Sequence, residues 1–193
     1  MGFEDETWWS RLARPAVHTW SERNHPLRLV EQRLAKDDPE AKALACYGLL
    51  VSSPGDAAFD AERVWLRFVP DRPVSAATIQ FLAWCCDRLQ AAGKKALLLI
   101  WDNASWHVSA AVKTWFREHS REVKRTGQGV RVIPSYLPVK SPWLNPLEVR
   151  WMQAKRHVFE AEAVLTPQQL AGRVCDHFRC PYEDHLVIPE NVS

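Results

Sequence analysis

The spacing of hydrophobic and polar positions changes several times along this chain, and each period predicts a different element. In the first third, short runs that alternate or are rich in β-forming residues predict strands. We expect these strands at residues 3–9, 16–20, 43–51 and 64–69. Because they follow one another without a helical segment, and Pro54-Gly55-Asp56 forms a turn signal before the last one, they predict an antiparallel meander.

A helical period follows the meander. Between Ser75 and Ala92 apolar residues recur at helical spacing, and Gly93 is suited to end the helix. The apolar run Ala96–Trp101 predicts a buried strand, residues 109–121 a second helix, and residues 130–136 another short strand. A strand, helix, strand order implies parallel pairing, so we expect one α/β domain with a mixed sheet.

The segment after Pro138 predicts a helix with a well-marked start. Asn145 is suited to the N-cap, Pro146 to the first helical position, and Glu148 to the third, which together form a capping-box pattern. The apolar stripe of this helix is expected to contain Leu144, Leu147, Trp151, Ala154 and Val158. Glu148 then lies at the rim of the core, on the same edge as Lys155.

A second capping-box pattern, Thr166 to Gln169, predicts a last helix that ends near Phe178. We expect one domain over residues 1–180 and an irregular tail over residues 181–193.

Composition narrows the class of protein. No apolar run approaches the roughly 20 residues that span a bilayer, and the first residues are acidic, unlike an export signal. Five cysteines are an odd number, and a chain of 193 residues does not need disulfides. We therefore expect a cytoplasmic protein with no membrane partner.

The formal charge of +2 hides an uneven distribution. Residues 109–160 carry ten basic side chains against four acidic ones. Such a local excess is typical of a surface that binds a polyanion, although solvated helix faces give the same pattern.

Three carboxylates are candidates for chemistry. Asp102 directly follows an aliphatic strand, where α/β folds place ligands, although it can instead organise the turn with Asn103. Strand alternation puts Asp5 on the face opposite to Glu4 and Glu6, although ordinary solvation explains an acidic chain start as well. Glu148 has the alternative role of a capping residue.

Several motifs together resemble a known family. They are Leu99-Ile100-Trp101-Asp102-Asn103 with Trp106-His107, then Leu137-Pro138, and Ser141-Pro142-Trp143-Leu144-Asn145-Pro146-Leu147-Glu148 with Trp151 and Lys155. The start, Phe3 to Trp8, is similar to that family's first catalytic strand. The chain thus resembles the catalytic domain of mariner-type bacterial insertion-sequence transposases, the DDE endonucleases of the IS-six-thirty group.

The resemblance implies a ribonuclease-H-like fold with Asp5, Asp102 and Glu148 as catalytic, metal-binding carboxylates. Three converging carboxylates repel one another, and bound divalent cations relieve this repulsion. Oxygen ligands suit Mg²⁺, with Mn²⁺ as a substitute, and two ions are expected. The implied reaction is DNA strand cleavage and strand transfer.

Further residues are expected to contact DNA. Lys140 and Lys155 are candidates for phosphate contacts, and Trp106 and Trp143 for stacking on unpaired bases. His107 is expected near the metal site or a phosphate. The alternatives are solvated lysines, tryptophans of the core and a buried histidine that packs the turn.

The family usually carries helix-turn-helix DNA-binding segments before the catalytic domain, and here we expect that N-terminal domain to be absent. The chain is then a separately encoded half, a frameshift-joined product or a truncated remnant. Expected partners are transposon-end and target DNA, an upstream DNA-binding polypeptide and a second copy in a homodimer, with nucleoid association on DNA. Alternative functions are a non-catalytic DNA-binding remnant and a ribonuclease-H-like nuclease in repair or RNA processing.

Overall fold

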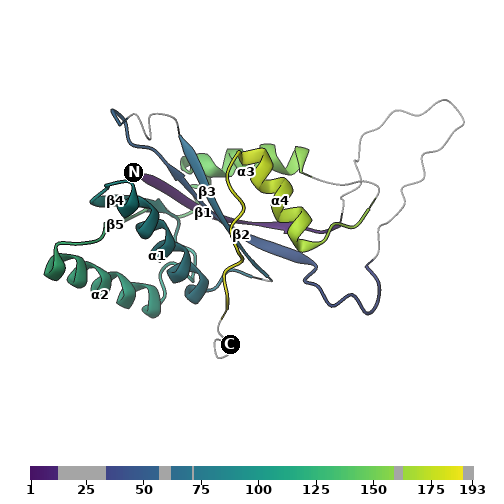
Figure 1. Cartoon of the computed structure of the whole chain (residues 1–193), viewed down its shortest axis with the longest axis horizontal. Helices are drawn as coiled ribbons and strands as arrows, with labels where there is room; N and C mark the ends of the chain where they lie inside the picture. Colours follow the sequence, from purple (N-terminus) through teal and green to yellow (C-terminus); the bar gives the residue numbers. More distant parts are fainter. Residues whose placement is uncertain (13–33, 57–61, 71, 159–162, 189–193) are drawn as a thin grey trace, which may run out of the picture.

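The computed structural model describes residues 1–12, 34–56, 62–70, 72–158 and 163–188. Within these ranges five strands form one sheet, which α-helices flank on both faces (Figure 1). The elements are β1 (Gly2–Ser10), β2 (Ala43–Val51), β3 (Arg63–Pro70), α1 (Ser75–Ala91), β4 (Ala96–Trp101), α2 (Ala110–Thr126), β5 (Arg131–Tyr136), η1 (Pro142–Leu144), α3 (Pro146–His157) and α4 (Pro167–Phe178).

The sheet has the order β3-β2-β1-β4-β5. β1, β2 and β3 pair antiparallel, whereas β4 pairs parallel with both β1 and β5. The predicted meander and the predicted strand, helix, strand unit are therefore both confirmed. The strand expected at residues 16–20 lies outside the described residues.

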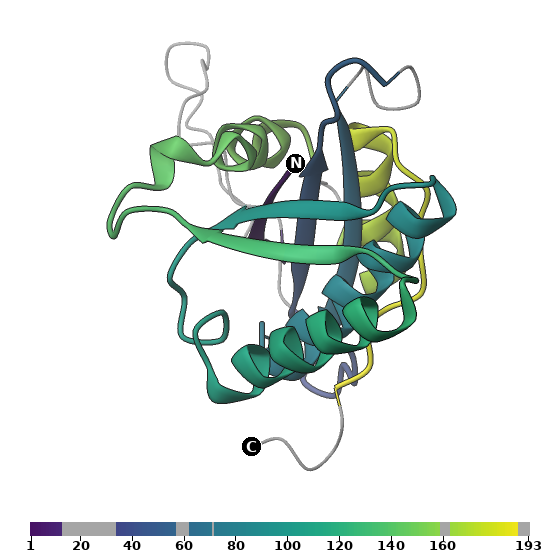
Figure 2. The same cartoon turned by 90° about the vertical axis from the view of Figure 1, so that its left-hand side faces the viewer.

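Each face of the sheet has its own hydrophobic core. Along β2, Tyr47 and Leu49 pack with α1 and α2 on one face of the sheet. Cys46 and Leu50 pack with α3 and α4 on the other face. Figure 2 shows α1 and α2 side by side along one face of the sheet. Because β2 is buried on both faces, its sequence is an almost continuous apolar run and does not alternate.

The helix α2 is longer than its apolar pattern predicts. It extends from the predicted end near Arg121 to Thr126, where Gly127 adopts a left-handed conformation with φ 68°. The additional turn is polar, and Glu122 forms an exposed ion pair with Arg125 within it. The prediction of the helix relied on its apolar face, and a surface turn that is stabilised by charges has no such face.

The start of α3 differs from the prediction in two respects. Leu144 belongs to η1 and is 46% exposed, so it is not part of the buried stripe, whereas Leu147, Trp151, Ala154 and Val158 are buried as expected. The capping box is also wrong. The Asn145 backbone N–H donates to the Pro142 carbonyl, so it does not need the Glu148 carboxylate. At α4, by contrast, the predicted capping box of Thr166 and Gln169 is confirmed.

Residues 181–188 have no regular secondary structure, yet they pack against the fold. Leu186 is buried, and its N–H donates to the Phe68 carbonyl of β3. In the described ranges, no helix is both long and apolar enough to cross a membrane. All five cysteines are unpaired.

Candidate metal centre

The strand register brings Asp5 to the end of β4. In the parallel pairing of β1 and β4, Gly2 lies opposite Leu99 and Phe3 opposite Ile100. The same register continued by two residues places Asp5 beside Asp102, which immediately follows β4. Neighbouring residues in register project from the same face of a sheet. Two carboxylates that are far apart in the sequence therefore meet at the carboxyl end of β4, inside the sheet.

A pocket of about 370 Å³ opens at this end of β4. Asp5, Asp102 and Glu148 all line it, together with the loop from Leu137 to Pro142 and the amides of Asn103 and Asn145. The three carboxylates predicted from the sequence thus share one cavity. They come from three separate elements: β1, the end of β4 and the first turn of α3.

Asp5 is buried, and a negative charge on its side chain is unfavourable there. Its side chain is one of the few buried carboxylates, and the Trp151 indole N–H donates to its Oδ2 atom across 3.0 Å. Burial, followed by the negative charges of Glu148, Glu6 and Asp102, raises the pKa of Asp5 to about 8. A nearby positive charge would stabilise the ionised form.

Gly48 makes room for the ring that contacts Asp5. It lies opposite Asp5 in the pairing of β1 and β2. A Cβ atom at Gly48 would stand 2.6 Å from Cζ2 and 2.7 Å from Cη2 of Trp151, well inside van der Waals contact. The missing side chain therefore allows Trp151 to lie over β2 and reach Asp5.

Asn145 attaches the start of α3 to the same strand. Its side-chain oxygen accepts from the Leu147 N–H and so caps the helix. Its amide nitrogen donates to the Glu4 carbonyl across 2.9 Å. This buried amide thus fixes the helix turn that carries Glu148 next to the residue before Asp5.

Asp102 is more than half exposed and uses only one of its two oxygens in the described contacts. Oδ1 accepts from the Ala104 N–H and contacts Nδ1 of His107 at 2.8 Å. The hydrogen bond with His107 lowers the pKa of Asp102, so this carboxylate is ionised at neutral pH. Oδ2 is left for a further ligand.

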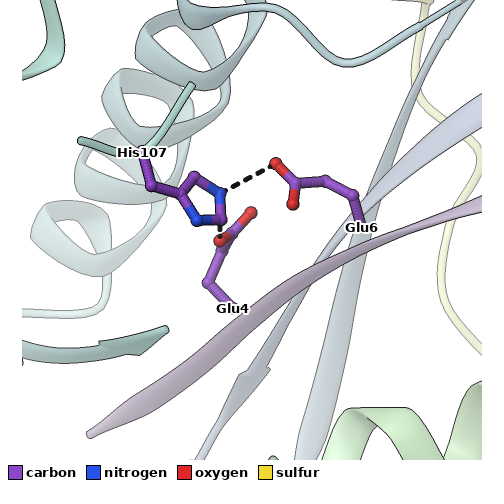
Figure 3. Close-up of side chains that lie close together, drawn as sticks. All are labelled: Glu4, Glu6 and His107. Atoms are coloured by element: carbon purple, nitrogen blue, oxygen red, sulfur yellow. Dashed lines mark hydrogen bonds and ion pairs between the residues drawn. The ribbon is translucent and has the colours of Figure 1, made fainter. Parts of the chain in front are cut away.

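His107 connects Asp102 to a second acidic group on the opposite face of β1. Its Nε2 atom lies 3.0 Å from Oε1 of Glu6 and 3.3 Å from Oε2 of Glu4, as Figure 3 shows. Burial by itself would lower the pKa of His107, but Glu4 and Glu6, together with hydrogen bonds to Asp102 and Glu6, raise it to about 11. The prediction that Glu4 and Glu6 face away from Asp5 is confirmed.

The residues predicted to contact DNA occupy different environments. Lys140 lines the pocket and is exposed, and Trp143, in η1 beside the pocket, is 71% exposed. Lys155 is exposed on α3 and is not among the pocket residues. His107 is fully buried, and Trp106 is partly buried with its indole N–H donating to Glu6. These two side chains therefore face protein carboxylates.

Sequence reasoning missed two contributions to this site. The helical pattern places Trp151 in the apolar stripe, and this pattern contains no signal of the hydrogen bond between Trp151 and Asp5. Strand alternation turns Glu6 away from Asp5, yet Glu6 contacts His107, which in turn contacts Asp102. Only the spacing Asp102 to His107 hinted at such a link.

The donor set fits hard divalent cations. The pocket offers carboxylate oxygens from Asp5, Asp102 and Glu148 and amide oxygens nearby, which are the ligands that Mg²⁺ and Mn²⁺ prefer. A cation would stabilise the ionised form of buried Asp5, and Oδ2 of Asp102 has no partner among the described contacts. The residues that line the pocket therefore fit a hard divalent cation.

The five-stranded mixed sheet, with three carboxylates around the end of β4, has a ribonuclease-H-like arrangement. Comparisons with known proteins identify the family. The family model of the DDE superfamily endonucleases matches residues 60–171, more than half of the chain. The chain belongs to this family. No curated protein sequence matches it.

Solved structures of Mos1 transposase share the fold. The Mos1 paired-end complex with the left transposon end superposes with a TM-score of 0.62 at 13% identity, over 94% of this chain and 48% of that one. The Mos1 mariner paired-end complex with Mn gives a TM-score of 0.59 at 14% identity, over 94% of this chain and 48% of that one. The chain thus spans about half the length of these transposases.

Proposed function

We propose that this chain is the catalytic domain of a transposase of a mariner-type bacterial insertion sequence, of the IS-six-thirty group. Its reaction is divalent-metal-dependent DNA strand cleavage and strand transfer. The observation that carries the proposal is the convergence of Asp5, Asp102 and Glu148 on one pocket within a DDE-family fold.

In this proposal the three carboxylates hold Mg²⁺, with Mn²⁺ as a substitute and two ions as the full complement. When bound, such ions stabilise charge on the phosphate and on the attacking and leaving oxygens of an in-line displacement. Asp5 is held by Trp151, Asp102 by His107 and Ala104, and Glu148 by the anchored start of α3. The protein thus positions each ligand through a separate contact.

DNA is the proposed substrate. Exposed Lys140 and Trp143 at the pocket support a phosphate contact and a stacking contact beside the carboxylates. Lys140 and Lys155 are two of the ten basic residues in 109–160, and this local excess of positive charge favours binding of a polyanion. For Trp106 and His107 we propose support of the metal centre through Glu6 and Asp102, in place of direct DNA contact.

The proposal also covers the domain organisation of the chain and the partners that it needs for transposition. Residues 1–180 form the catalytic domain and residues 181–193 its tail. An upstream DNA-binding polypeptide supplies recognition of the transposon ends, and a homodimer brings two ends together. The reaction takes place in the cytoplasm, on nucleoid DNA. Solved structures of Mos1 include a paired-end complex with the left transposon end and a strand transfer complex, which supports DNA as the partner of this chain.

The test is nicking of supercoiled plasmid with Mg²⁺ or Mn²⁺ by the purified chain. We expect metal-dependent nicking that Asp102→Asn and Glu148→Gln abolish, while the exposed Glu118→Gln retains it. Full activity in both carboxylate variants overturns the proposal. Salt-sensitive DNA binding without any cleavage identifies a non-catalytic remnant.

A parallel assay compares RNA–DNA hybrid with duplex DNA carrying terminal inverted repeats. The proposal requires cleavage of the duplex, and exclusive cleavage of the RNA strand identifies a ribonuclease H.

A further inference from the structure

We infer that Glu4, Glu6 and His107 form a second cation site, separate from the carboxylate pocket, which takes a transition-metal dication such as Mn²⁺ or Zn²⁺. The three residues offer one nitrogen and two carboxylate groups, and their ligand atoms all lie within 4.8 Å of one another. Figure 3 shows the three side chains pointing toward a common point between β1 and the loop before α2.

The spacing around His107 suits a bound ion. Nε2 lies 3.0 Å from Glu6 Oε1 and 3.3 Å from Glu4 Oε2. Ligands about 2.0–2.1 Å from a tetrahedral ion are about 3.3 Å apart. The side chains of these residues are at most 3% exposed, so the site is shielded from solvent.

Glu4 provides a second, independent observation. Its side chain is fully buried, and neither carboxylate oxygen has a hydrogen-bond partner within the described part of the chain. A proton on His107 Nε2 serves only one carboxylate, and the better placed one is Glu6. A buried carboxylate without hydrogen bonds is costly even beside a protonated histidine, whereas one dication can contact all three ligands at once.

The surrounding contacts are those that metal sites use to orient their ligands. His107 Nδ1 faces Asp102 Oδ1 at 2.8 Å, so a metal that displaces the proton from Nε2 would bind a ring whose orientation Asp102 already fixes. The Trp106 indole N–H donates to Glu6 Oε1 at 2.9 Å. A mixed set of imidazole and carboxylate ligands favours Mn²⁺ or Zn²⁺ over Mg²⁺.

This site is chemically distinguishable from the pocket. The pocket presents oxygen ligands from Asp5, Asp102 and Glu148, whereas this site includes a ring nitrogen. Glu4 and Glu6 also project from the face of β1 opposite to Asp5. The inference does not depend on nuclease activity, because metal binding is measured without DNA.

The experiment is pulsed electron paramagnetic resonance of Mn²⁺ added to the metal-stripped full chain. We expect ¹⁴N coupling from an imidazole in the wild type and in Glu148→Gln. Glu4→Gln should lose this signal or bind Mn²⁺ at least about tenfold more weakly, and the control Glu118→Gln should not.

Two results would overturn the inference. One is a wild-type spectrum with oxygen ligands only, which requires no variant and shows that a proton alone occupies the cluster. The other is unchanged nitrogen-coupled binding in both Glu4→Gln and Glu6→Gln, with folding of each variant checked by circular dichroism.

Discussion

Trp151 and Asp5 are joined by a hydrogen bond of 3.0 Å between the indole N–H and Oδ2, across 146 residues of sequence. The same helix is attached to β1 a second time, through the Asn145 amide and the Glu4 carbonyl. Because Glu148 lies between these two attachments on α3, its position relative to Asp5 is set by how one helix packs on one strand. The packing of α3 on β1 and the relative position of the Asp5 and Glu148 carboxylates are therefore coupled.

Gly48→Ala tests this coupling. The added methyl group would overlap the Trp151 ring, so we expect a loss of about 1–3 kcal/mol in the free energy of unfolding. Displacement of Trp151 should also weaken Mg²⁺ binding at the pocket. Gly172→Ala is the matched control, because no atom lies within 4 Å of its added Cβ and the residue is in α4. It should raise stability slightly and leave Mg²⁺ binding unchanged. Equal behaviour of the two variants would argue against the role of Gly48.

Asn145→Asp separates helix capping from attachment to β1. Aspartate is as good an N-cap as asparagine, so α3 should form, but a carboxylate cannot donate to the Glu4 carbonyl. We expect weaker Mg²⁺ binding and a loss of about 1–3 kcal/mol, measured by calorimetry and urea unfolding. Thr166→Ala removes the cap of α4 at a cost of about 1 kcal/mol and should not change metal binding. Normal binding in Asn145→Asp would show that the attachment is dispensable.

The metal-free protein should lose stability as the pH rises. The folded-state pKa of Asp5 is raised to about 8 from an ordinary value of 3.8, so folding holds a proton that the unfolded chain releases above about pH 4. This penalty grows up to about pH 8. The pKa of His107, raised to about 11 from 6.5, acts in the same direction above pH 6.5. Chemical unfolding with EDTA should therefore give a lower free energy at pH 8 than at pH 6.

Asp5→Asn should reduce this pH dependence. We expect the variant to be more stable than the wild type at pH 8 without metal, by on the order of 1–3 kcal/mol. At pH 4 the difference should vanish, because Asp5 is then protonated in the folded protein. A variant that is less stable than the wild type at pH 8 would contradict the buried-charge assignment.

Trp143→Ala should weaken binding of single-stranded DNA. The side chain is 71% exposed beside the pocket, and loss of one stacked base costs about 1–3 kcal/mol, or roughly 5- to 150-fold in affinity. Fluorescence anisotropy measures the change. Trp8→Ala removes another exposed tryptophan and serves as the control, because Trp143 directly follows the pocket residue Pro142, whereas Trp8 has no pocket residue next to it in the chain. Equal losses in the two variants would indicate non-specific effects.

Local patterns predicted most of the fold because each element has its own period or cap. The apolar run before Asp102 and the Asn145-Pro146 start of α3 located two of the pocket carboxylates on the correct elements. Alternation in β1 separated Asp5 from Glu4 and Glu6 correctly.

What the sequence could not provide were contacts between distant elements. The Glu148 carboxylate is left for the pocket because η1 satisfies the Asn145 N–H, and a capping-box pattern cannot indicate that competing bond. The Trp151 contact with Asp5 depends on the space that Gly48 leaves, which involves three elements at once. Likewise, the Glu6 to His107 contact depends on the path of a loop, for which the chain has no periodic signal.

The most direct test of the shared metal centre is Mg²⁺-dependent thermal stabilisation at pH 8, with ionic strength held constant. For the wild type, the unfolding temperature should rise with Mg²⁺ concentration, following RT ln(1 + [Mg²⁺]/Kd). In Asp5→Asn, Asp102→Asn and Glu148→Gln, the rise should be strongly reduced, because each variant removes one carboxylate ligand from the pocket. An undiminished rise in all three variants would contradict the proposal that these residues hold the ion together.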